Sequence, residues 1–337
     1  MSQSTARPAP APWLAPALKT LLNQRGHAWL LSGPSGLGQY TLALELARAW
    51  LCLQLSEEGA CGHCDSCRNI DLRTHADLRL LMPETQMLDK GWPLHEKAQK
   101  EIDDKDRKPS REIRVDAARE MVAFTQTTRS GGRHKVVLIY PAERMNHITA
   151  NTILKTLEEP PGDTRFLLVS EAAHLLLPTL RSRCQTHHLT WPDAAPALEW
   201  LSAQGVPSAD AKVLLDAAGG RPEDAWALAQ EGLKASTWLA LPKAVARGDA
   251  QALQAWAPPQ AVAVLQKVCH DCLLLAVGAA PRFFPTQALP MGATLAALTQ
   301  WSKDLMASAK TAEHPFNAGL MLEALVSQAR GALQPLR

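Results

Sequence analysis

The sequence lacks the apolar runs that would place it in a membrane or in the secretory pathway. No uncharged stretch reaches the length of a membrane-spanning helix. The first residues, MSQSTARPAPAPWLAPAL, contain no apolar core of the kind found in signal peptides. A net charge of only +2 excludes a histone-like polycation but permits a local basic face. We therefore expect a soluble, cytoplasmic protein with no membrane partner.

What the sequence does contain is enough apolar residues for more than one core. Hydrophobic residues make up 46% of the chain, which excludes global disorder, and 337 residues fit two or three domains. The chain also has seven cysteines. Because the cytosol is reducing, we expect these to be metal ligands or buried thiols rather than disulfides.

Five short apolar runs alternate with helical patterns in the first part of the chain. They have strand length and a near-continuous apolar character, and they lie at residues 28–33, 77–82, 135–140, 165–170 and 184–189. Between two of them, Ala150, Ile153 and Leu157 follow one face of a helix that Pro160 ends. This alternation predicts a parallel sheet covered by helices on both faces.

Beyond about residue 190 the pattern predicts helices only. Short helices joined by Gly and Pro turns continue to about residue 235, and the rest is rich in Ala and Leu. We predict an α/β module over 1–189, a small helical domain over 190–235 and an all-α domain over 236–337. Residues 90–112, KGWPLHEKAQKEIDDKDRKPSRE, carry dense charge of both signs, and we interpret them as a solvated, mobile insertion.

Four cysteines are spaced as C-x8-C-x2-C-x2-C at Cys52, Cys61, Cys64 and Cys67. Four thiolates suit tetrahedral zinc, and a closed four-sulfur site has a structural role. The alternative, four unrelated core cysteines, is disfavoured because the stretch is polar. A second C-x2-C pair at 269–272 lies in an apolar helical pattern without further ligands, and we interpret it as buried.

The stretch LLSGPSGLGQYT at residues 30–41 almost matches the phosphate-binding loop G-x-x-x-x-G-K-[ST]. Gly33 and Gly38 have the right spacing, but Gln39 and Tyr40 replace the Lys that reaches the phosphates and the Ser or Thr that binds magnesium. We expect a loop that keeps its strand–turn–helix shape and binds no ATP.

The second half of a nucleotide site is missing as well. Proteins that hydrolyse ATP with such a loop end the third strand with an acidic pair that holds magnesium. Here Tyr140 and Pro141 stand at that point, and Glu143 lies two residues further on. Since both halves are lost together, we expect no ATP turnover at this site.

These pieces occur in an order that resembles one family. The loop at 33–38, the cysteine insertion at 52–67, IRVDAARE at 113–120, NTILKTLEEPPGDTRFLLVS at 151–170 and LRSRCQTHHL at 180–189 follow one another as in bacterial clamp loaders of the AAA+ class. The combination resembles the delta-prime subunits of DNA polymerase III. The resemblance is close over about residues 10–190, and beyond them it rests on length and helical texture. It implies an AAA+ module with a zinc knuckle, a helical lid and a C-terminal helical collar.

The sequence departs from that family in two places. The charged insertion at 83–111 is longer than expected, and HAD at 75–77 stands where the family usually has a His-Pro-Asp turn.

The resemblance also implies a role in a hetero-pentameric ring with delta and gamma/tau subunits, which loads the sliding clamp on primer–template DNA. Arg183 of the SRC motif, with Ser182 and Cys184, would be an arginine finger that acts on the ATP site of a neighbouring subunit. Arg181 is the rival candidate, and a local ion pair is the alternative role for Arg183. The chain would belong to a nucleotidyltransferase holoenzyme and have no ATPase activity of its own.

Two other functions remain open at this point. One is an active AAA+ ATPase of the gamma/tau type that uses unusual residues, and the other is a zinc-dependent DNA-binding module. The basic loop TTRSGGRHK at 127–135 either contacts DNA phosphates or is an ordinary turn.

Overall fold

The structure is a computed structural model that describes residues 11–312, 314 and 317–334 of the 337-residue chain. The first ten residues of the predicted α/β module and the last three of the predicted collar lie outside the described residues. The chain divides into two compact units, with the boundary between Pro192 and Asp193.

The first unit is built on a five-stranded sheet with the order β2-β3-β4-β1-β5, in which every neighbouring pair is parallel. The strands are β1 (Ala28–Ser32), β2 (Leu78–Leu81), β3 (Lys135–Ile139), β4 (Thr164–Ser170) and β5 (Gln185–His188). Their register places Phe166 of β4 between Ala28 and Val137 of its two neighbours. The predicted parallel sheet is confirmed.

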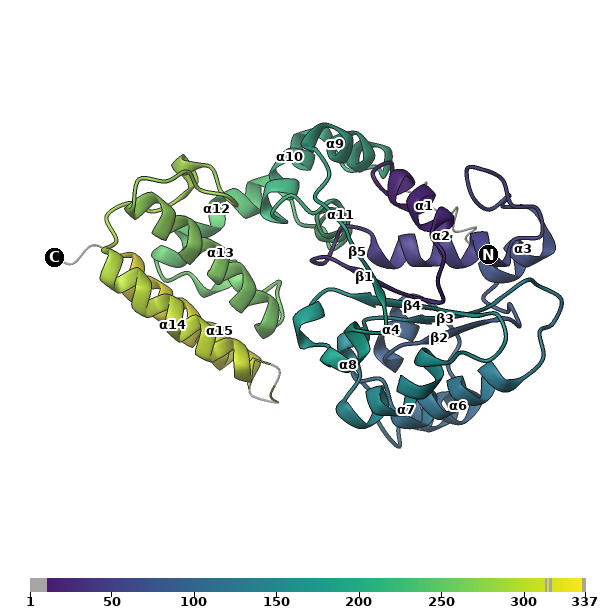
Figure 1. The fold of residues 1–337 in the computed structure, drawn as a ribbon. Helices are drawn as coiled ribbons and strands as arrows, with labels where there is room; N and C mark the ends of the chain where they lie inside the picture. The colour runs from purple at the N-terminus through teal and green to yellow at the C-terminus, as the bar shows by residue number, and fades with distance from the viewer. Residues whose placement is uncertain (1–10, 313, 315–316, 335–337) are drawn as a thin grey trace. The chain divides into compact units, whose positions relative to one another are not determined.

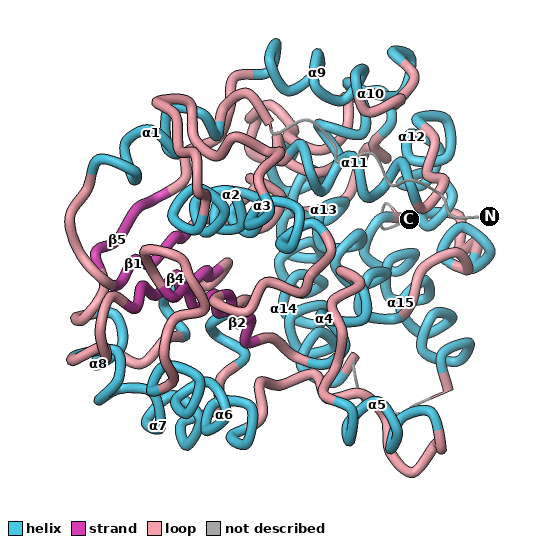
Figure 2. Tube along the Cα trace, turned by 90° about the vertical axis from the view of Figure 1, so that its right-hand side faces the viewer, coloured by secondary structure: helices cyan, strands magenta, loops and turns pink. Residues whose placement is uncertain are grey.

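Helices cover both faces of this sheet, as Figures 1 and 2 show: α1, α2 and α3 lie on one side, and α6, α7 and α8 on the other. The helices of the first unit are α1 (Leu14–Asn23), α2 (Gln39–Leu51), α3 (Asp65–Asp71), α4 (Glu84–Asp89), α5 (Glu96–Asp103), α6 (Val115–Gln126), α7 (His147–Glu158) and α8 (Pro178–Arg181). Two short 3-10 helices, η1 (Ala142–Arg144) and η2 (Ala173–Leu175), follow β3 and β4.

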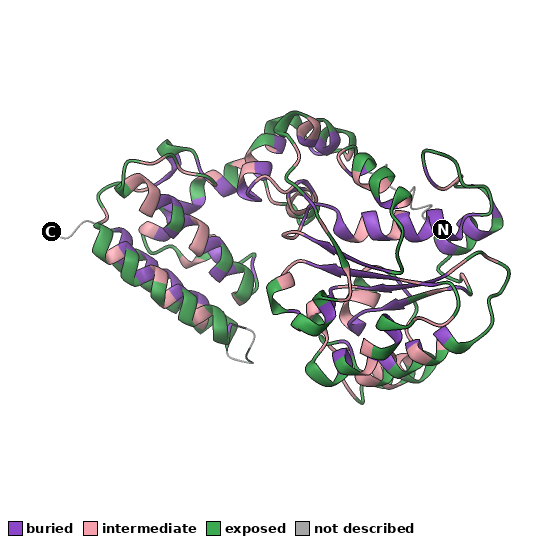
Figure 3. Cartoon of the chain, viewed as in Figure 1, coloured by how far each residue is buried: buried purple, intermediate pink, exposed green. Residues whose placement is uncertain are grey.

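The central strands are buried along their whole length, because both faces meet helices. Every residue of β1 and β3 is buried (Figure 3). On the α6–α7 side, Leu30, Val137 and Phe166 pack with Met121 and Ile153 in one apolar cluster. Alternate residues of the same strands face α2, which explains why these runs are apolar without alternation.

The prediction of a buried strand at 184–189 is wrong in one respect. The strand β5 forms, but it lies at the edge of the sheet, and none of its four residues is fully buried. Gln185 and His188 are polar and exposed, which suits a position that has a neighbouring strand on one side only.

The second unit is helical. Its helices are α9 (Ala194–Ala203), α10 (Ser208–Ala217), α11 (Pro222–Gln230), α12 (Ala235–Ala246), α13 (Pro258–Ala276), α14 (Leu295–Thr311) and α15 (Ala318–Leu333), with the 3-10 turns η3 (Ala250–Leu253) and η4 (Thr286–Ala288). Among the residues that the structure describes, no helix is both long and apolar enough to cross a bilayer.

One apolar core runs through most of the second unit. Trp238 stacks on Phe284 with ring centroids 4.6 Å apart, and Ala217 of α10 belongs to the same cluster. The predicted buried pair at 269–272 is confirmed: Cys269 and Cys272 lie on α13, and burial raises the pKa values of their thiols to about 11 and about 12. The finer division into lid and collar stays a prediction.

Candidate nucleotide site and cysteine cluster

The degenerate loop keeps the shape of a phosphate-binding loop. It leaves the carboxyl end of β1 at Gly33 and enters α2, whose N-cap Gly38 has φ of 95°. Only glycine adopts this left-handed conformation readily, which explains why the second glycine of the pattern remains. The loop lies where β1 is flanked by β4 and β5, at the edge where parallel sheets usually bind ligands.

Gln39 uses its side chain inside this loop. Its amide is buried, and Nε2 donates to the carbonyl oxygen of Gly33 at 2.7 Å and to that of Pro34. Gln39, which stands at the position of the phosphate-binding lysine, therefore forms hydrogen bonds with the backbone of its own loop. It adds no charge at the position where a phosphate would need one.

Tyr40 and Tyr140 pack against each other, although 100 positions separate them in the sequence. Their ring centroids are 5.1 Å apart with an interplanar angle of 35°. The topology explains the contact, because β4 alone separates β1 from β3 and the residues that follow the two strands meet beyond its end. Tyr40 and Tyr140 stand at the positions of the loop hydroxyl and of the acidic pair, and their rings are in contact.

The hydroxyl groups of both tyrosines have partners. Tyr140 donates to Glu171 Oε1 at 2.8 Å, and Tyr40 accepts from Trp92 Nε1 at 2.7 Å. Burial raises the pKa of Tyr40 above its ordinary value, against smaller opposing effects of Trp92 and Arg73. The Tyr40 phenol is therefore a neutral hydrogen-bonding group at physiological pH.

Lys90 and Trp92 complete this group, and sequence reasoning missed both. Lys90 Nζ lies 4.6 Å from the ring centroid of Tyr40 and 5.4 Å from that of Tyr140. Trp92 is buried, with 8% of its surface exposed. The one available signal was a tryptophan in a segment otherwise composed of charged and polar residues.

Glu143 has a structural contact after β4. It lies in η1, and its Oε1 accepts a hydrogen bond from the backbone N–H of Glu171 at 3.0 Å. It therefore supports the backbone that follows β4.

The four predicted cysteines come together. Their sulfur atoms all lie within 4.8 Å of one another, and those of Cys52 and Cys64 are 3.8 Å apart. Tetrahedral zinc with Zn–S bonds of about 2.3 Å requires sulfurs about 3.8 Å apart. Backbone N–H groups of Gln54 and Cys61 each point at the Cys52 sulfur at 3.3 Å. The cluster therefore fits a metal ion with four thiolate ligands.

The electrostatics of the cluster agree with that fit. At Cys64 burial raises the thiol pKa, but backbone N–H groups and neighbouring thiols outweigh this effect and lower the pKa to about 6. At Cys67 burial and the neighbouring thiols raise the pKa to about 12. Four thiols this close cannot all ionise by themselves, because neighbouring thiolates repel one another. A bound dication would offset that repulsion and allow all four to ionise.

The rest of the module holds the cluster in place. Cys52 follows the last residue of α2, and Cys64 is the N-cap of α3. Arg48 of α2 is buried and donates to the Cys67 carbonyl oxygen at 3.3 Å and to Asp71 at 3.0 Å. The knuckle is thus tied to the helix that begins at the degenerate loop.

Arg183 lies on the surface beside α7. Its Nε and Nη2 donate to Glu158 Oε2 at 3.0 and 2.9 Å, its Nη1 donates to the Thr179 carbonyl oxygen at 2.9 Å, and 31% of the side chain is exposed. Of its SRC neighbours, Ser182 caps α8, and burial raises the pKa of the Cys184 thiol to about 12.

Comparison with known proteins decides the family. A family model described as "DNA polymerase III, delta subunit" matches residues 15–193, more than half of the 337-residue chain. This chain belongs to the DNA polymerase III delta subunit family.

The relatives agree with this assignment. The chain is 40% identical over 215 residues to DNA polymerase III subunit delta' of Pseudomonas aeruginosa, covering 63% of this chain and 58% of that protein. It is 35% identical over 226 residues to the corresponding subunit of Escherichia coli K12, covering 65% and 60%. The chain therefore spans less than two thirds of the length of these relatives.

A solved structure confirms the fold. The DNA polymerase III gamma subunit-related protein of Thermotoga maritima superposes with a TM-score of 0.50 at 15% identity, covering 95% of this chain and 100% of that one. At this identity the likeness concerns the fold alone.

The basic loop at residues 127–135 makes hydrogen bonds and an ion pair with other residues of its own unit. The Ser130 N–H donates to the buried carboxylate of Asp77 at 3.0 Å, and Arg129 pairs with Asp163 at 2.8 Å. Lys135 is buried, and its ammonium donates to the Phe124 carbonyl oxygen at 2.6 Å. These contacts support the reading as an ordinary turn and leave DNA binding by the loop a prediction.

Proposed function

We propose that this chain is a non-hydrolysing subunit of the DNA polymerase III clamp loader, acting in the loading of the sliding clamp during replication. The observation that carries the proposal is the packing of Tyr40 on Tyr140 at 5.1 Å. One damaged position could be compensated from elsewhere, but here both positions for magnesium ligands are filled by aromatic rings in mutual contact.

Magnesium and ATP do not fit these residues. Magnesium in phosphate-binding loops takes a small hydroxyl, carboxylates and phosphate oxygens in octahedral geometry. At this site Gln39 is hydrogen-bonded to its own loop, and the phenol of Tyr140 donates to Glu171. Without lysine and metal contacts, a phosphoryl-transfer site loses several kcal/mol of transition-state stabilisation.

Arg183 is the residue that we propose acts in trans. Its present partner, Glu158, is 57% exposed, and exposed ion pairs contribute only about 0–1 kcal/mol. An arginine finger at a γ-phosphate is worth about 10³–10⁵ in rate, or about 4–7 kcal/mol. The ion pair with Glu158 is weak enough to be given up, and we propose that it serves as a resting position from which Arg183 reaches a neighbour's phosphate.

The test is Arg183→Ala in a clamp loader reconstituted with delta and gamma/tau subunits. We expect ATP turnover at the adjacent site to fall on the order of 10³-fold. In single-turnover kinetics this appears as a smaller burst amplitude, because one ATP site no longer contributes to it. Arg181→Ala is the matched comparison, because Arg181 is exposed and is the rival candidate; we expect the loss in Arg183→Ala and not in Arg181→Ala. Unchanged burst amplitude in Arg183→Ala would exclude the finger.

Glu158→Gln separates the finger from a structural ion pair. The variant removes the carboxylate partner and keeps the arginine. A finger predicts full activity, whereas a structural ion pair predicts the same loss as Arg183→Ala.

The remaining parts of the proposal follow from this role. The cysteine cluster would hold a structural Zn²⁺, because four sulfur ligands leave no open coordination position for chemistry. The ring with delta and gamma/tau subunits, its contact with primer–template DNA and the cytoplasmic location of the complex rest on the family and on the residues above.

A further inference from the structure

We propose that the charged insertion supplies a permanent internal occupant of the degenerate nucleotide site, made of Lys90 and Trp92. The inference deepens the proposed function and rests on it. It assigns the loss of nucleotide binding to two causes: the missing loop residues, and a segment that fills the site they leave. The insertion is then part of the site and not a solvated appendage.

The first step is the position of the Lys90 ammonium. It lies within 4.6 and 5.4 Å of the ring centroids of Tyr40 and Tyr140, the two residues at the positions of magnesium ligands. These are the only two tyrosines in the chain. The Lys90 ammonium makes cation–π contacts with both tyrosine rings. A positive charge of the protein itself therefore lies beside the two positions at which a magnesium ion would have its ligands.

The second step is the indole of Trp92. It is buried, and Nε1 donates to Tyr40 Oη at 2.7 Å. The indole thereby fixes the tyrosine ring in the orientation that Lys90 contacts. A nucleotide phosphate could enter only if the indole and the ammonium both withdrew.

The third step is the turn that delivers these two side chains. Gly91 lies between them with φ of 63°, and Arg73 Nη1 donates to its carbonyl oxygen. The Arg73 guanidinium also lies 5.6 Å from the ring centroid of Trp92. A Cβ at position 91 would displace the Arg73 guanidinium, and the positive φ there favours glycine, so Gly91→Ala should disturb both the turn and its contact with Arg73.

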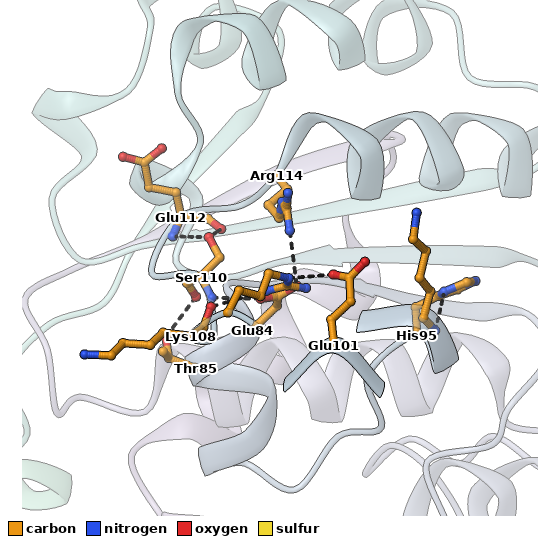
Figure 4. Close-up of polar contacts among 10 residues, drawn as sticks. Glu84, Thr85, His95, Glu101, Lys108, Ser110, Glu112 and Arg114 are labelled. Carbon is orange, nitrogen blue, oxygen red and sulfur yellow. Dashed lines mark hydrogen bonds and ion pairs between the residues drawn. The ribbon is translucent and has the colours of Figure 1, made fainter. Parts of the chain in front are cut away.

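The fourth step is the base of the insertion, drawn in Figure 4. Glu84 at the start of α4 accepts from Arg107 Nη2 at 2.7 Å and from the Ser110 N–H at 2.7 Å, and Arg107 Nε donates to Glu101 of α5 at 2.7 Å. Both ends of the segment are therefore joined, and the turn that carries Lys90 and Trp92 is closed at its base.

A competing idea uses the same residue in the opposite way. Lys90 could replace the missing loop lysine and attract phosphate. The two ideas predict opposite signs for removal of Lys90 from a loop whose lysine has been restored. An occupant would block binding, and a substitute lysine would support it.

The experiment measures binding of ATP with Mg²⁺ by isothermal titration calorimetry on the full chain. The background is Gln39→Lys, which restores the loop lysine and keeps Tyr40, the ring that Lys90 and Trp92 contact. We expect this background to bind weakly, and the further removal of both side chains by Lys90→Ala and Trp92→Ala to tighten binding on the order of tenfold or more. No tightening, or weaker binding, would overturn the inference.

Gly91→Ala on the same background is an independent route to the same result. It leaves Lys90 and Trp92 in the chain but disturbs the turn, and it should tighten binding in the same direction. Circular dichroism melts verify that each variant is folded. If Gly91→Ala is folded and does not change the affinity, the insertion does not act as the occupant.

The proposed function fails in a different way from the inference. Turnover of ATP with Mg²⁺ by the wild-type chain alone would contradict the proposed non-hydrolysing role. Absence of turnover by the wild type together with equal affinities of the loop with the restored lysine, with and without Lys90 and Trp92, would contradict the inference alone.

Discussion

The two sites at the ends of helix α2 differ in what their side chains contact. At its N-terminus the loop from Gly33 to Gly38 keeps its backbone shape, while Gln39 donates to the Gly33 carbonyl oxygen and Tyr40 packs on Tyr140. At its C-terminus the four cysteines keep an arrangement that fits an ion. One site is filled by side chains of the protein, and the other presents four thiol ligands that fit a metal ion.

The difference follows from what surrounds each site. The loop lies on a packed sheet, so its shape is supported by a core that does not depend on a ligand. The knuckle has no such core: its cluster consists of three buried cysteines with Ala60 and Cys61 packed against them. Segments of this kind in small zinc domains fold with their metal, so we expect the knuckle to depend on a metal ion more than the loop does.

The largest expected effect is therefore loss of the metal. Cys67→Ser should abolish stoichiometric zinc and unfold the knuckle, since structural zinc contributes about 10–16 kcal/mol of binding free energy in small zinc domains. Zinc content by mass spectrometry under native conditions and the melting temperature of the first unit measure it. Cys184→Ser is the control, because Cys184 lies outside the cluster; zinc retained in Cys67→Ser would break the contrast between the two sites.

A smaller effect is expected at the base of the insertion. Glu84→Gln should weaken the anchoring by about 1–3 kcal/mol, because Arg107 loses its charged acceptor. Hydrogen exchange of the backbone amides at 84–112 should accelerate, while that of the amides in α2 stays unchanged. Equal acceleration in both would mean that the insertion is not a separate element.

The same carboxylate gives a pH dependence. Burial opposes ionisation of Glu84, but the hydrogen bonds from Arg107 and Ser110 outweigh it and hold the pKa below its ordinary value of 4.5. Stability from a depressed carboxylate pKa is present above the unfolded value and is lost as the pH falls through the folded value. Protection factors at 84–112, which correct the exchange rates for their intrinsic pH dependence, should therefore fall below about pH 4.5 in the wild type, and Glu84→Gln should lose this dependence.

The smallest effect is expected inside the filled site. Tyr40→Phe leaves the buried Trp92 Nε1 without its acceptor and should destabilise the first unit by about 1–2 kcal/mol in urea unfolding. Tyr140→Phe is the matched comparison, because the hydroxyl it removes bonds to Glu171 and not to the insertion. If Tyr40→Phe does not change the stability, Trp92 does not depend on this contact.

Much of the fold could be predicted because its signals are local. Continuous apolar runs marked the strands, and the spacing of Cys52, Cys61, Cys64 and Cys67 indicated the metal cluster. The edge position of β5 could not be predicted, since exposure depends on which strands become neighbours. The interpretation of the insertion as solvated holds for α5, which has no buried residue, but it failed for Trp92.

The sequence by itself determined that Gln39, Tyr40 and Tyr140 stand where a phosphate-binding loop and its acidic partner have lysine, a small hydroxyl and carboxylates, and this predicts the loss of charge and of magnesium ligands. Only the tertiary structure decided what these residues do instead. Contacts between Tyr40, Tyr140 and Lys90 join three segments that are far apart in the chain. Such contacts follow from strand order and from the path of an insertion, and neither leaves a periodic signal in the sequence.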